Sequence, residues 1–349
     1  MGHGAFDASA LRLNTEENMK FIDDIKEFSE TVRKVANQAA SGRWNRFLIR
    51  LDFLYCQARF HVTDQEYLDF QFYNYKNRYR KNFLLRYHQK QKFEKLCAQP
   101  GLTRSKYAFY QKVPNCFARE MILAPNCGAD AFVEFAKKHK KIVIKPDLGS
   151  LGRSINVFTY QNDAHARLLF TMVPEASVCE EFICQHEKMS ELSPDSVNTI
   201  RFVSLWEPDG VKIISATLRT GGRAGSLVDN LKKDGVGAQI DVETGIVSTN
   251  GFDYNDHLYV KHPLSGVQFL GFNIPNWEEA VALVKKGHEQ LSQNRLLGWD
   301  IAITQDGADV VEANSRPGTP ITQLVDRIPK GEKVLRAIRT AKKIKRKTK

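Results

Sequence analysis

The sequence predicts an α+β fold in which a helical N-terminal region precedes a part that mixes strands with helices. Over residues 21–35, apolar side chains recur at steps of three and four, which is typical of one face of a helix. After residue 101 the chain changes to short runs rich in β-branched residues, separated by helical patterns. Because strands and helices do not alternate regularly, the pattern favours α+β over a doubly wound parallel sheet.

The composition is that of a folded protein. With 349 residues, of which 42% are hydrophobic, the chain can form one large or two modest cores. No apolar run approaches the roughly 20 residues that span a bilayer, and residues 1–13 lack the regions of a signal peptide. The six cysteines form no CxxC pair, which favours free thiols over disulfides or a zinc site. We therefore expect a cytoplasmic protein, either free or at the inner face of the membrane.

The net charge of +11 is concentrated in two stretches. Residues 336–349 contain eight Lys or Arg and no acid, which leaves +3 for the rest of the chain. Residues 76–95 contain eight Lys or Arg and a single acid, Glu94. Such stretches attract polyanions, although a solvated face and a frayed tail have the same composition. Because no nucleic-acid-binding motif accompanies the charge, an anionic membrane surface or glycan, rather than nucleic acid, is the alternative partner for the basic tail.

Individual elements follow from local patterns. The helix over 21–35 is expected to end at Ser41-Gly42, and a second apolar stripe runs over 44–54. We expect the aromatic residues of 67–87 to pack in a core or between domains. Strands are predicted at 142–144, 177–183, 199–206 and 212–218, with a hairpin of 300–304 and 309–313 around Asp306-Gly307. Helices are predicted at 129–139, 163–170 and 277–291.

A glycine-rich segment lies between two predicted strands and has a lysine at its base. Lys145 opens it, and Gly149, Ser150 and Gly152 follow. Backbone N–H groups of such a turn can approach anionic oxygens closely, and the lysine supplies charge for a phosphate. A plain turn between strands is the alternative. No GKS or GKT follows the glycines, so the segment is not a Walker A loop.

Two groups of acidic residues lie on predicted strands. Glu180 and Glu181 could accept hydrogen bonds from a base or a ribose, although an edge strand with solvated acids is the alternative. Glu312 and Asn314 share one face of a strand because side chains alternate, and Asp300 lies on the preceding strand of the hairpin. Three converging oxygen ligands suit Mg²⁺. Asp300 alone would be interpreted as a strand-end acid.

Polar residues also interrupt the apolar strands between these groups. Arg201 lies among Val, Phe and Leu, and an arginine there is costly to bury unpaired. A structural salt bridge, a polyphosphate or a developing phosphoryl charge would satisfy it. Arg219 and Asn230 follow, the latter before Gly235 and Gly237.

Taken in order, these motifs resemble those of the ATP-grasp superfamily, over about residues 102–325. The resemblance is to the branch of sugar-transfer associated ATP-grasp proteins and ribosomal-protein glutamate ligases. It implies an ATP-grasp fold, in which two sheet-containing subdomains (101–184 and 185–330) sandwich ATP. An N-terminal helical region (1–100) would precede them, and a basic C-terminal tail (331–349) would follow. The likeness of the first hundred residues to this branch is loose.

The resemblance implies roles for the candidate residues. ATP would be bound by Lys106, Lys145, Gly149, Ser150, Gly152, Glu180, Glu181, Phe182, Ile183 and Glu187. Mg²⁺ would be held by Asp300, Glu312 and Asn314, and the catalytic residues would be Arg201, Arg219 and Asn230. Three positions depart from the family pattern: Ser105 replaces an Asp before the first lysine, the Gly-Gly turn is Gly235-Val-Gly237, and Gly298 replaces an arginine found in some ligases.

The resemblance implies an ADP-forming ligase that makes an amide from a carboxylate and an amine through an acylphosphate. Its branch suggests the modification of a polysaccharide or sugar conjugate, with a small-molecule or glycan carboxylate as one substrate. Two alternatives stay open. One is an ATP-grasp kinase that phosphorylates a hydroxyl, and the other is a non-catalytic polyanion-binding protein regulated by ATP.

Overall fold

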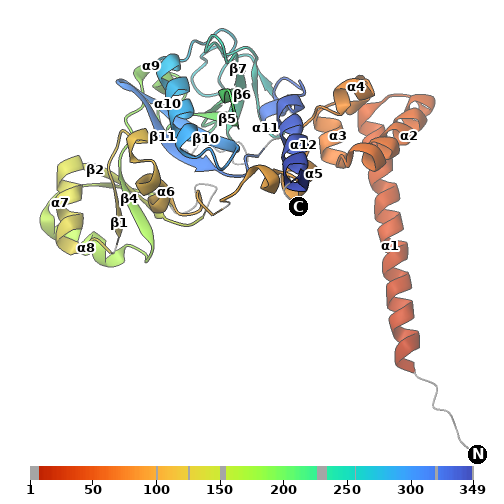
Figure 1. Cartoon of the computed structure of the whole chain (residues 1–349), viewed down its shortest axis with the longest axis horizontal. Helices are drawn as coiled ribbons and strands as arrows, with labels where there is room; N and C mark the ends of the chain where they lie inside the picture. Colours follow the sequence, from red (N-terminus) through yellow and green to blue (C-terminus); the bar gives the residue numbers. More distant parts are fainter. Residues whose placement is uncertain are drawn as a thin grey trace, which may run out of the picture.

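The computed structural model describes residues 8–99, 101–124, 126–149, 155–225, 234–255, 257–318 and 321–347, without the side chains of 8–19, 21, 22, 321 and 342–347. The N-terminal helical region lies at one end of the molecule, and its first helix extends away from the rest (Figure 1). Its elements are α1 (Ala8–Ala39), α2 (Arg43–Phe60), α3 (Asp64–Asp69), η1 (Phe72–Asn74), α4 (Asn77–Arg80), α5 (Arg86–Gln91) and η2 (Phe93–Leu96).

Local signals explain how these helices begin and end. His61 closes α2 in the left-handed conformation. Thr63 then starts α3 with a capping box, in which its hydroxyl accepts from the backbone N–H of Glu66 and the Glu66 carboxylate accepts from that of Thr63. The predicted packing of the aromatic stretch is confirmed for its buried members, which are Tyr67, Phe70, Phe72 and Phe83.

A small antiparallel sheet follows, with the strand order β1-β4-β2-β3. Its strands are β1 (Met121–Ala124), β2 (Lys141–Pro146), β3 (Asn156–Thr159) and β4 (Ser177–Glu181). Helices α7 (Ala129–His139) and α8 (Asp163–Met172) pack on one face through a core that includes Phe132, Ile144 and Phe158. A short helix, α6 (Lys106–Lys112), and η3 (Pro114–Cys116) precede this sheet.

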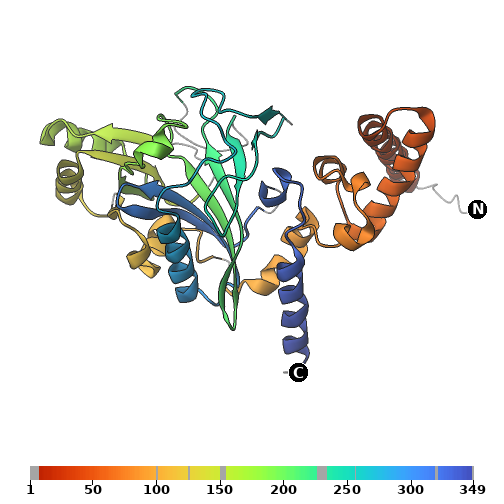
Figure 2. The ribbon, with the colours of Figure 1, turned by 90° about the horizontal axis from the view of Figure 1, so that it is seen from above.

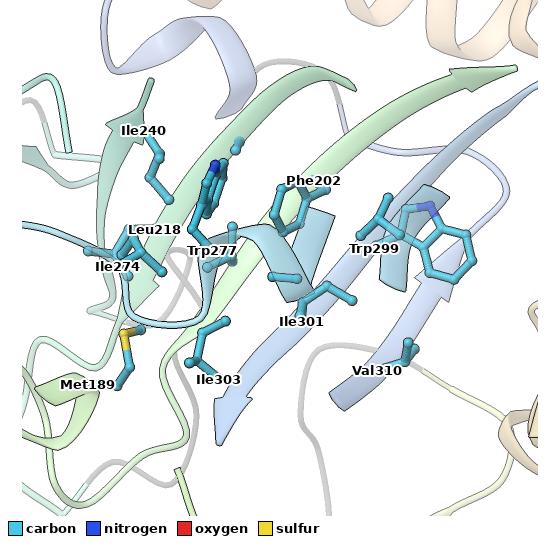
Figure 3. Close-up of a cluster of buried hydrophobic side chains, with 14 of the residues drawn as sticks. Met189, Phe202, Leu218, Ile240, Ile274, Trp277, Trp299, Ile301, Ile303 and Val310 are labelled. Carbon is cyan, nitrogen blue, oxygen red and sulfur yellow. The ribbon is translucent and has the colours of Figure 1, made fainter. Parts of the chain in front are cut away.

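The large sheet is antiparallel and has the order β11-β10-β5-β6-β7-β8-β9. Its strands are β5 (Thr199–Glu207), β6 (Gly210–Thr220), β7 (Val236–Ile240), β8 (Gly251–Phe252), β9 (Leu258–Tyr259), β10 (Leu296–Thr304) and β11 (Gly307–Asn314). Helix α10 (Trp277–Gln290) covers one face, where its Trp277 stacks on Phe202 at 5.2 Å between ring centroids (Figure 3). Because side chains alternate along a strand, Arg201 points to the opposite face.

Three more helices complete the chain: α9 (Glu187–Ser190), α11 (Ile321–Leu324) and α12 (Glu332–Lys347). In both views, α12 lies between the large sheet and the N-terminal helices (Figures 1 and 2). Val334, Leu335 and Ile338 of α12 pack against Phe93 of η2 and Leu205 of β5. The face of the large sheet opposite α10 is therefore partly covered by helical segments from both ends of the chain.

The α+β class and the helical N-terminal region are confirmed. The predicted strands and helices are present, with bounds that differ by a few residues; β10, for example, begins at Leu296 rather than at residue 300. All six cysteines are free, as expected. Within the described residues, no helix is long and apolar enough to cross a membrane.

Candidate active site

A pocket with a cavity volume of about 40 Å³ lies between the small and the large sheet and is partly open to solvent. One wall comes from the segment around α6 and the turn after β2, and the other comes from β11. Its lining residues are Thr103, Arg104, Lys106, Phe109, Phe117, Met121, Gly149, Val311, Glu312, Ala313 and Asn314. Segments about two hundred residues apart in the sequence thus meet in one pocket.

The two walls are joined at one edge by hydroxyl groups. The Thr103 hydroxyl lies 3.0 Å from that of Ser315 and accepts a hydrogen bond from the backbone N–H of Ser315 at 3.2 Å. Ser315 follows directly on β11, and Thr103 comes shortly before α6. This contact fixes the start of one wall to the end of the other.

Lys106 lies at the start of α6, beneath the glycine-rich turn. Its Nζ donates to the backbone oxygens of Pro146 (2.9 Å), Asp147 (3.2 Å) and Gly149 (3.2 Å). Burial lowers the pKa of Lys106, and the nearby charge of Lys145 lowers it further. Ser105, which departs from the family pattern, caps α6 by accepting from the backbone N–H of residue 108 at 3.0 Å. The structure thus brings Lys106 and Gly149 together, whereas Ser150 and Gly152 lie outside the described residues.

Lys145, the residue before the end of β2, forms a buried ion pair with Glu180 of β4. Its Nζ lies 2.7 Å from the Glu180 carboxylate, and both side chains are almost inaccessible to solvent. Burial alone would raise the pKa of Glu180, but Lys145 and Arg119 outweigh burial and lower it. The alternative of an edge strand with solvated acids is wrong for Glu180, because β4 lies between β1 and β2.

Arg119 was not singled out by the sequence, yet it connects the two sheets. Its guanidinium lies 3.2 Å from the Glu180 carboxylate, and its Nη1 lies 2.6 Å from a carboxylate oxygen of Asp309 on β11. The same nitrogen donates to the backbone oxygen of Val310 at 2.7 Å. Arg119 precedes β1 in an irregular segment, so no periodic pattern marks it as buried.

The segment after β4 contains the other residues expected at the nucleotide. The Glu181 carboxylate lies 3.4 Å from Nδ1 of His139, and the Lys141 ammonium lies 3.6 Å from the centre of the Phe182 ring. Ile183 is half-buried, and Glu187 is exposed on α9. These four predicted residues do not belong to the lining of the pocket described above.

The predicted metal ligands lie on the facing wall. Asp300 of β10 and Glu312 of β11 are directly opposite each other across the ladder. The Asn314 amide donates to the Glu312 carboxylate at 3.1 Å, so both side chains lie on one face of β11, as the alternation predicts. Of these three residues, Glu312 and Asn314 line the pocket itself.

Two arginines hold Asp300. Arg201 lies on β5, directly opposite Asp300 in the ladder with β10. It donates to both carboxylate oxygens of Asp300 through Nε and Nη2, the latter at 2.8 Å. Nη1 of Arg219 donates to one of the same oxygens at 3.0 Å. The sequence left open whether a salt bridge, a polyphosphate or a phosphoryl charge balances Arg201; the structure shows a salt bridge with Asp300. Asn230 lies outside the described residues.

The electrostatics of this wall fit a divalent cation. Burial would raise the pKa of Asp300, but Arg201 and Arg219 lower it well below the usual range. Burial raises the pKa of Glu312, and the negative charge of Asp300 raises it further. Less positive charge acts on Glu312 than on Asp300, so these two effects are not outweighed. A cation beside Glu312 and Asn314 would supply that compensation, and oxygen donors suit Mg²⁺. No group of three His, Cys, Asp or Glu in the described part of the chain could hold a metal, so further ligands would have to come from phosphate and water.

A protein-family model matches the part of the chain that contains most of the candidate site residues. Residues 169–330 match the family model described as sugar-transfer associated ATP-grasp. The predicted ATP-grasp resemblance is confirmed. The ATP-grasp match includes Glu180, Arg201, Arg219, Asp300, Glu312 and Asn314. The two antiparallel sheets agree with the ATP-grasp fold that the motifs implied.

Solved ATP-grasp structures are similar at a general level. The ATP-grasp ligase PsnB, complexed with minimal precursor, Mg and ADP, has 11% identity and a TM-score of 0.41, covering 69% of this chain and 59% of its own. D-alanine–D-alanine ligase from Bacillus anthracis has 14% identity and a TM-score of 0.41, covering 71% of this chain and 70% of its own. The present chain thus spans 59% of the length of PsnB. No curated protein sequence matches it.

Proposed function

We propose that the protein is an ADP-forming ligase that uses Mg-ATP to join a carboxylate to an amine. The observation that carries this proposal is the pocket between the sheets, where Lys106 and Gly149 face Glu312 and Asn314. A positive charge and a glycine backbone on one wall suit phosphate oxygens. Carboxylate and amide oxygens on the other wall suit the Mg²⁺ that accompanies a triphosphate.

In this proposal the small sheet binds the nucleotide. Lys106 and Lys145 would neutralise phosphate oxygens, and the backbone of the turn from Gly149 through Ser150 to Gly152 would cover them. The segment from Glu180 to Ile183 would contact the adenine, and Glu187 the ribose. Lys145 is already oriented by Glu180 at 2.7 Å, so little side-chain freedom would be lost when it meets a phosphate.

The large sheet would contribute the groups that act on the reacting atoms. Asp300, Glu312 and Asn314 would hold Mg²⁺, which when bound offsets the negative charge of the phosphates. Arg201 and Arg219, both held by Asp300, would stabilise the oxyanion that develops at the substrate carbonyl. A guanidinium has five N–H groups, so each arginine can bind Asp300 and still reach a substrate oxygen. We include Asn230 in this group on the family pattern alone.

The proposed reaction has two steps. An oxygen of the substrate carboxylate attacks the γ-phosphorus of ATP, the bond to the bridging oxygen breaks, and ADP leaves with that electron pair. The amine then attacks the acyl carbon of the acylphosphate, and phosphate leaves with the electrons of the carbon–oxygen bond. The amine nitrogen loses a proton to solvent, and the product is an amide. Positioning and charge neutralisation would supply most of the acceleration.

The substrates are proposed by class only. The description of the matched family model, sugar-transfer associated ATP-grasp, favours a sugar conjugate or polysaccharide as the molecule that is modified. A glycan or small-molecule carboxylate would then be joined to an amine, for example that of an amino acid or amino sugar.

Release of ADP and phosphate across a matrix of uronic acids, amino acids and amino sugars tests this function. We expect ADP and phosphate in equal amounts only when a carboxylate and an amine are both present, with an amide detected by mass spectrometry. ADP formation that saturates without an amine, together with a base-stable phosphorylated product, would select a kinase instead. Unchanged biological function of an Asp300→Ala/Glu312→Ala double variant would point to the non-catalytic alternative.

A further inference from the structure

Helix α2 has apolar side chains on two opposite faces. Phe53 and Cys56 on its inner face are fully buried in the core of the helical region. A second apolar row, spaced by three and four residues, faces solvent, and we name it the α2 outer face: Trp44, Phe47, Leu48, Leu51 and Tyr55. Trp44 is 70% exposed and Leu51 51% exposed. Since one apolar face suffices to hold a helix on its own core, the outer face requires another explanation.

The apolar row of α1 is also only partly covered. Val32 and Val35 pack in the same core as α2, whereas Ile25 and Phe28, further toward the free end of the helix, are exposed. Both views place the helices α1 and α2 at the end of the molecule away from the two sheets (Figures 1 and 2). This end of the protein therefore presents large apolar side chains at a distance from the candidate active site.

The charges that α2 itself places around its outer face are positive. Helix α2 contains four arginines (43, 46, 50 and 59) and a single acid, Asp52. Asp52 points to the inner side, where it binds Arg80 at 2.7 Å and accepts from the Tyr67 hydroxyl at 2.6 Å. The carboxylate of α2 is thus already paired, and its outer half offers only positive charge.

A second basic element lies beside the C-terminal end of this face. The Asn77 amide of α4 donates to the Tyr55 hydroxyl at 2.9 Å. This contact places the exposed Lys76 and Arg78 next to Tyr55. Tyr79 is exposed as well, with the Arg78 guanidinium 4.8 Å from its ring centre. Apolar, aromatic and basic groups thus form one continuous surface.

We propose that the α2 outer face binds the surface of an anionic lipid bilayer, with α2 lying in the plane of the interface. An exposed helix with Trp and Leu on one face, flanked by arginines, gains from both the acyl boundary and anionic headgroups. Pairing with a second copy would instead bring two arginine-rimmed faces together, and the like charges would repel. No described helix can cross a bilayer, so the contact is peripheral.

Vesicle binding by the full chain tests this proposal. We expect the protein to sediment with vesicles in which about a third of the lipid is phosphatidylglycerol, and not with phosphatidylcholine alone. The double variant Leu48→Glu/Leu51→Glu should bind at least about tenfold more weakly, and Arg43→Gln/Arg50→Gln should lose most of the preference for anionic lipid. Leu168→Glu on α8, where the leucine is 60% exposed, is the matched control and should bind like the wild type.

Tryptophan fluorescence gives an independent readout. Trp44 is the most exposed of the four tryptophans, so vesicles should shift the emission to shorter wavelength, and Trp44→Phe should remove the shift. The substituted side chains are exposed, so circular dichroism and thermal unfolding should show intact folds.

Three results would overturn the proposal. The first is the absence of vesicle binding by the wild type. The second is binding that persists in Leu48→Glu/Leu51→Glu but disappears when residues 342–349, which contain six Lys or Arg, are removed; that result would assign the contact to the basic tail. The third is a dimer in ultracentrifugation that Leu51→Glu dissociates, which would assign the face to a second copy of the chain.

Discussion

The Nη1 atom of Arg119 lies 2.6 Å from the carboxylate of Asp309, and this contact joins the segment before the small sheet to a strand of the large one. The same guanidinium binds Glu180, which in turn binds Lys145. All four side chains are buried, and their formal charges balance. A network that closes only when both sheets are in place makes the orientation of Lys145 depend on the contact between them.

Replacing Arg119 with Met should destabilise the fold. The substitution leaves Glu180 and Asp309 buried without their shared partner, and breaking a buried network in this way costs about 3–5 kcal/mol. Thermal or urea unfolding measures the loss. Arg167→Met is the control, because the Arg167–Asp130 pair is exposed and is expected to contribute less than about 1 kcal/mol. Equal losses in the two variants would contradict the role of the network.

Lys106→Met should weaken nucleotide binding. Lys106 lines the pocket beneath the glycine-rich turn, and a charge-assisted bond to a phosphate contributes about 1.5–3 kcal/mol, so at least about tenfold in affinity should be lost. Titration calorimetry with ADP or a non-hydrolysable ATP analogue and Mg²⁺ measures the change. Lys112→Met at the other end of α6 removes the same charge from an exposed position and should bind like the wild type.

Glu312→Gln should lower the turnover of ATP without lowering the stability of the fold. Burial and Asp300 raise the pKa of Glu312, so a neutral amide should leave the unfolding temperature unchanged or raise it. Turnover of Mg-ATP should fall by more than about tenfold, because one proposed oxygen ligand loses its charge. Parallel unfolding and ADP-release measurements check both parts. A variant that turns over ATP like the wild type would remove Glu312 from the proposed site.

His288 should make stability depend on pH. It is fully buried between α10 and the large sheet, where its Nε2–H donates to the backbone oxygen of Asn294 and its Nδ1 accepts from the Ser204 hydroxyl. Burial lowers the pKa of His288 to about 4 from an ordinary value of 6.5. The unfolded chain therefore binds the proton first, so this part of the stability is present above pH 6.5 and is lost as the pH falls toward 4.

The size of this effect follows from the shift, which corresponds to about 3 kcal/mol. Urea unfolding at several pH values should show the loss in the wild type and a smaller pH dependence in His288→Gln, at a lower overall stability. His257→Gln, at a histidine that is 63% exposed, is the control and should keep the wild-type slope. Parallel curves for the wild type and His288→Gln would contradict this assignment.

Local sequence patterns were enough to predict which way some of the candidate side chains point. Glu312 and Asn314 share a face because strands alternate. Asp300 meets Glu312 only because a β-bulge between Asp300 and Ile301 shifts the register that the turn sets, which would otherwise place Asp300 opposite residue 311. The burial of Glu180 was not predictable, since it depends on β4 lying between β1 and β2, an order that no local pattern encodes. Arg119 was missed because it lies in an irregular segment.

The α2 outer face shows a second limit of prediction from the sequence. Periodicity predicts that residues 44–54 form a helix with an apolar face, but it does not say whether the chain itself covers that face. Here the inner row of α2 meets the core, and the row that the sequence emphasised stays exposed. The domain boundaries and the roles of all the predicted site residues stay predictions.

The Thr103–Ser315 contact restricts how the pocket could admit the proposed nucleotide. Because these hydroxyls fasten the walls along one edge, the two sheets cannot separate by sliding apart without breaking that contact. Rotation of the small sheet about this edge would also strain the Arg119–Asp309 ion pair, so widening of the mouth would be opposed by both contacts. Gly149 belongs to the side of the small sheet, so such a rotation would move it relative to Glu312 on β11.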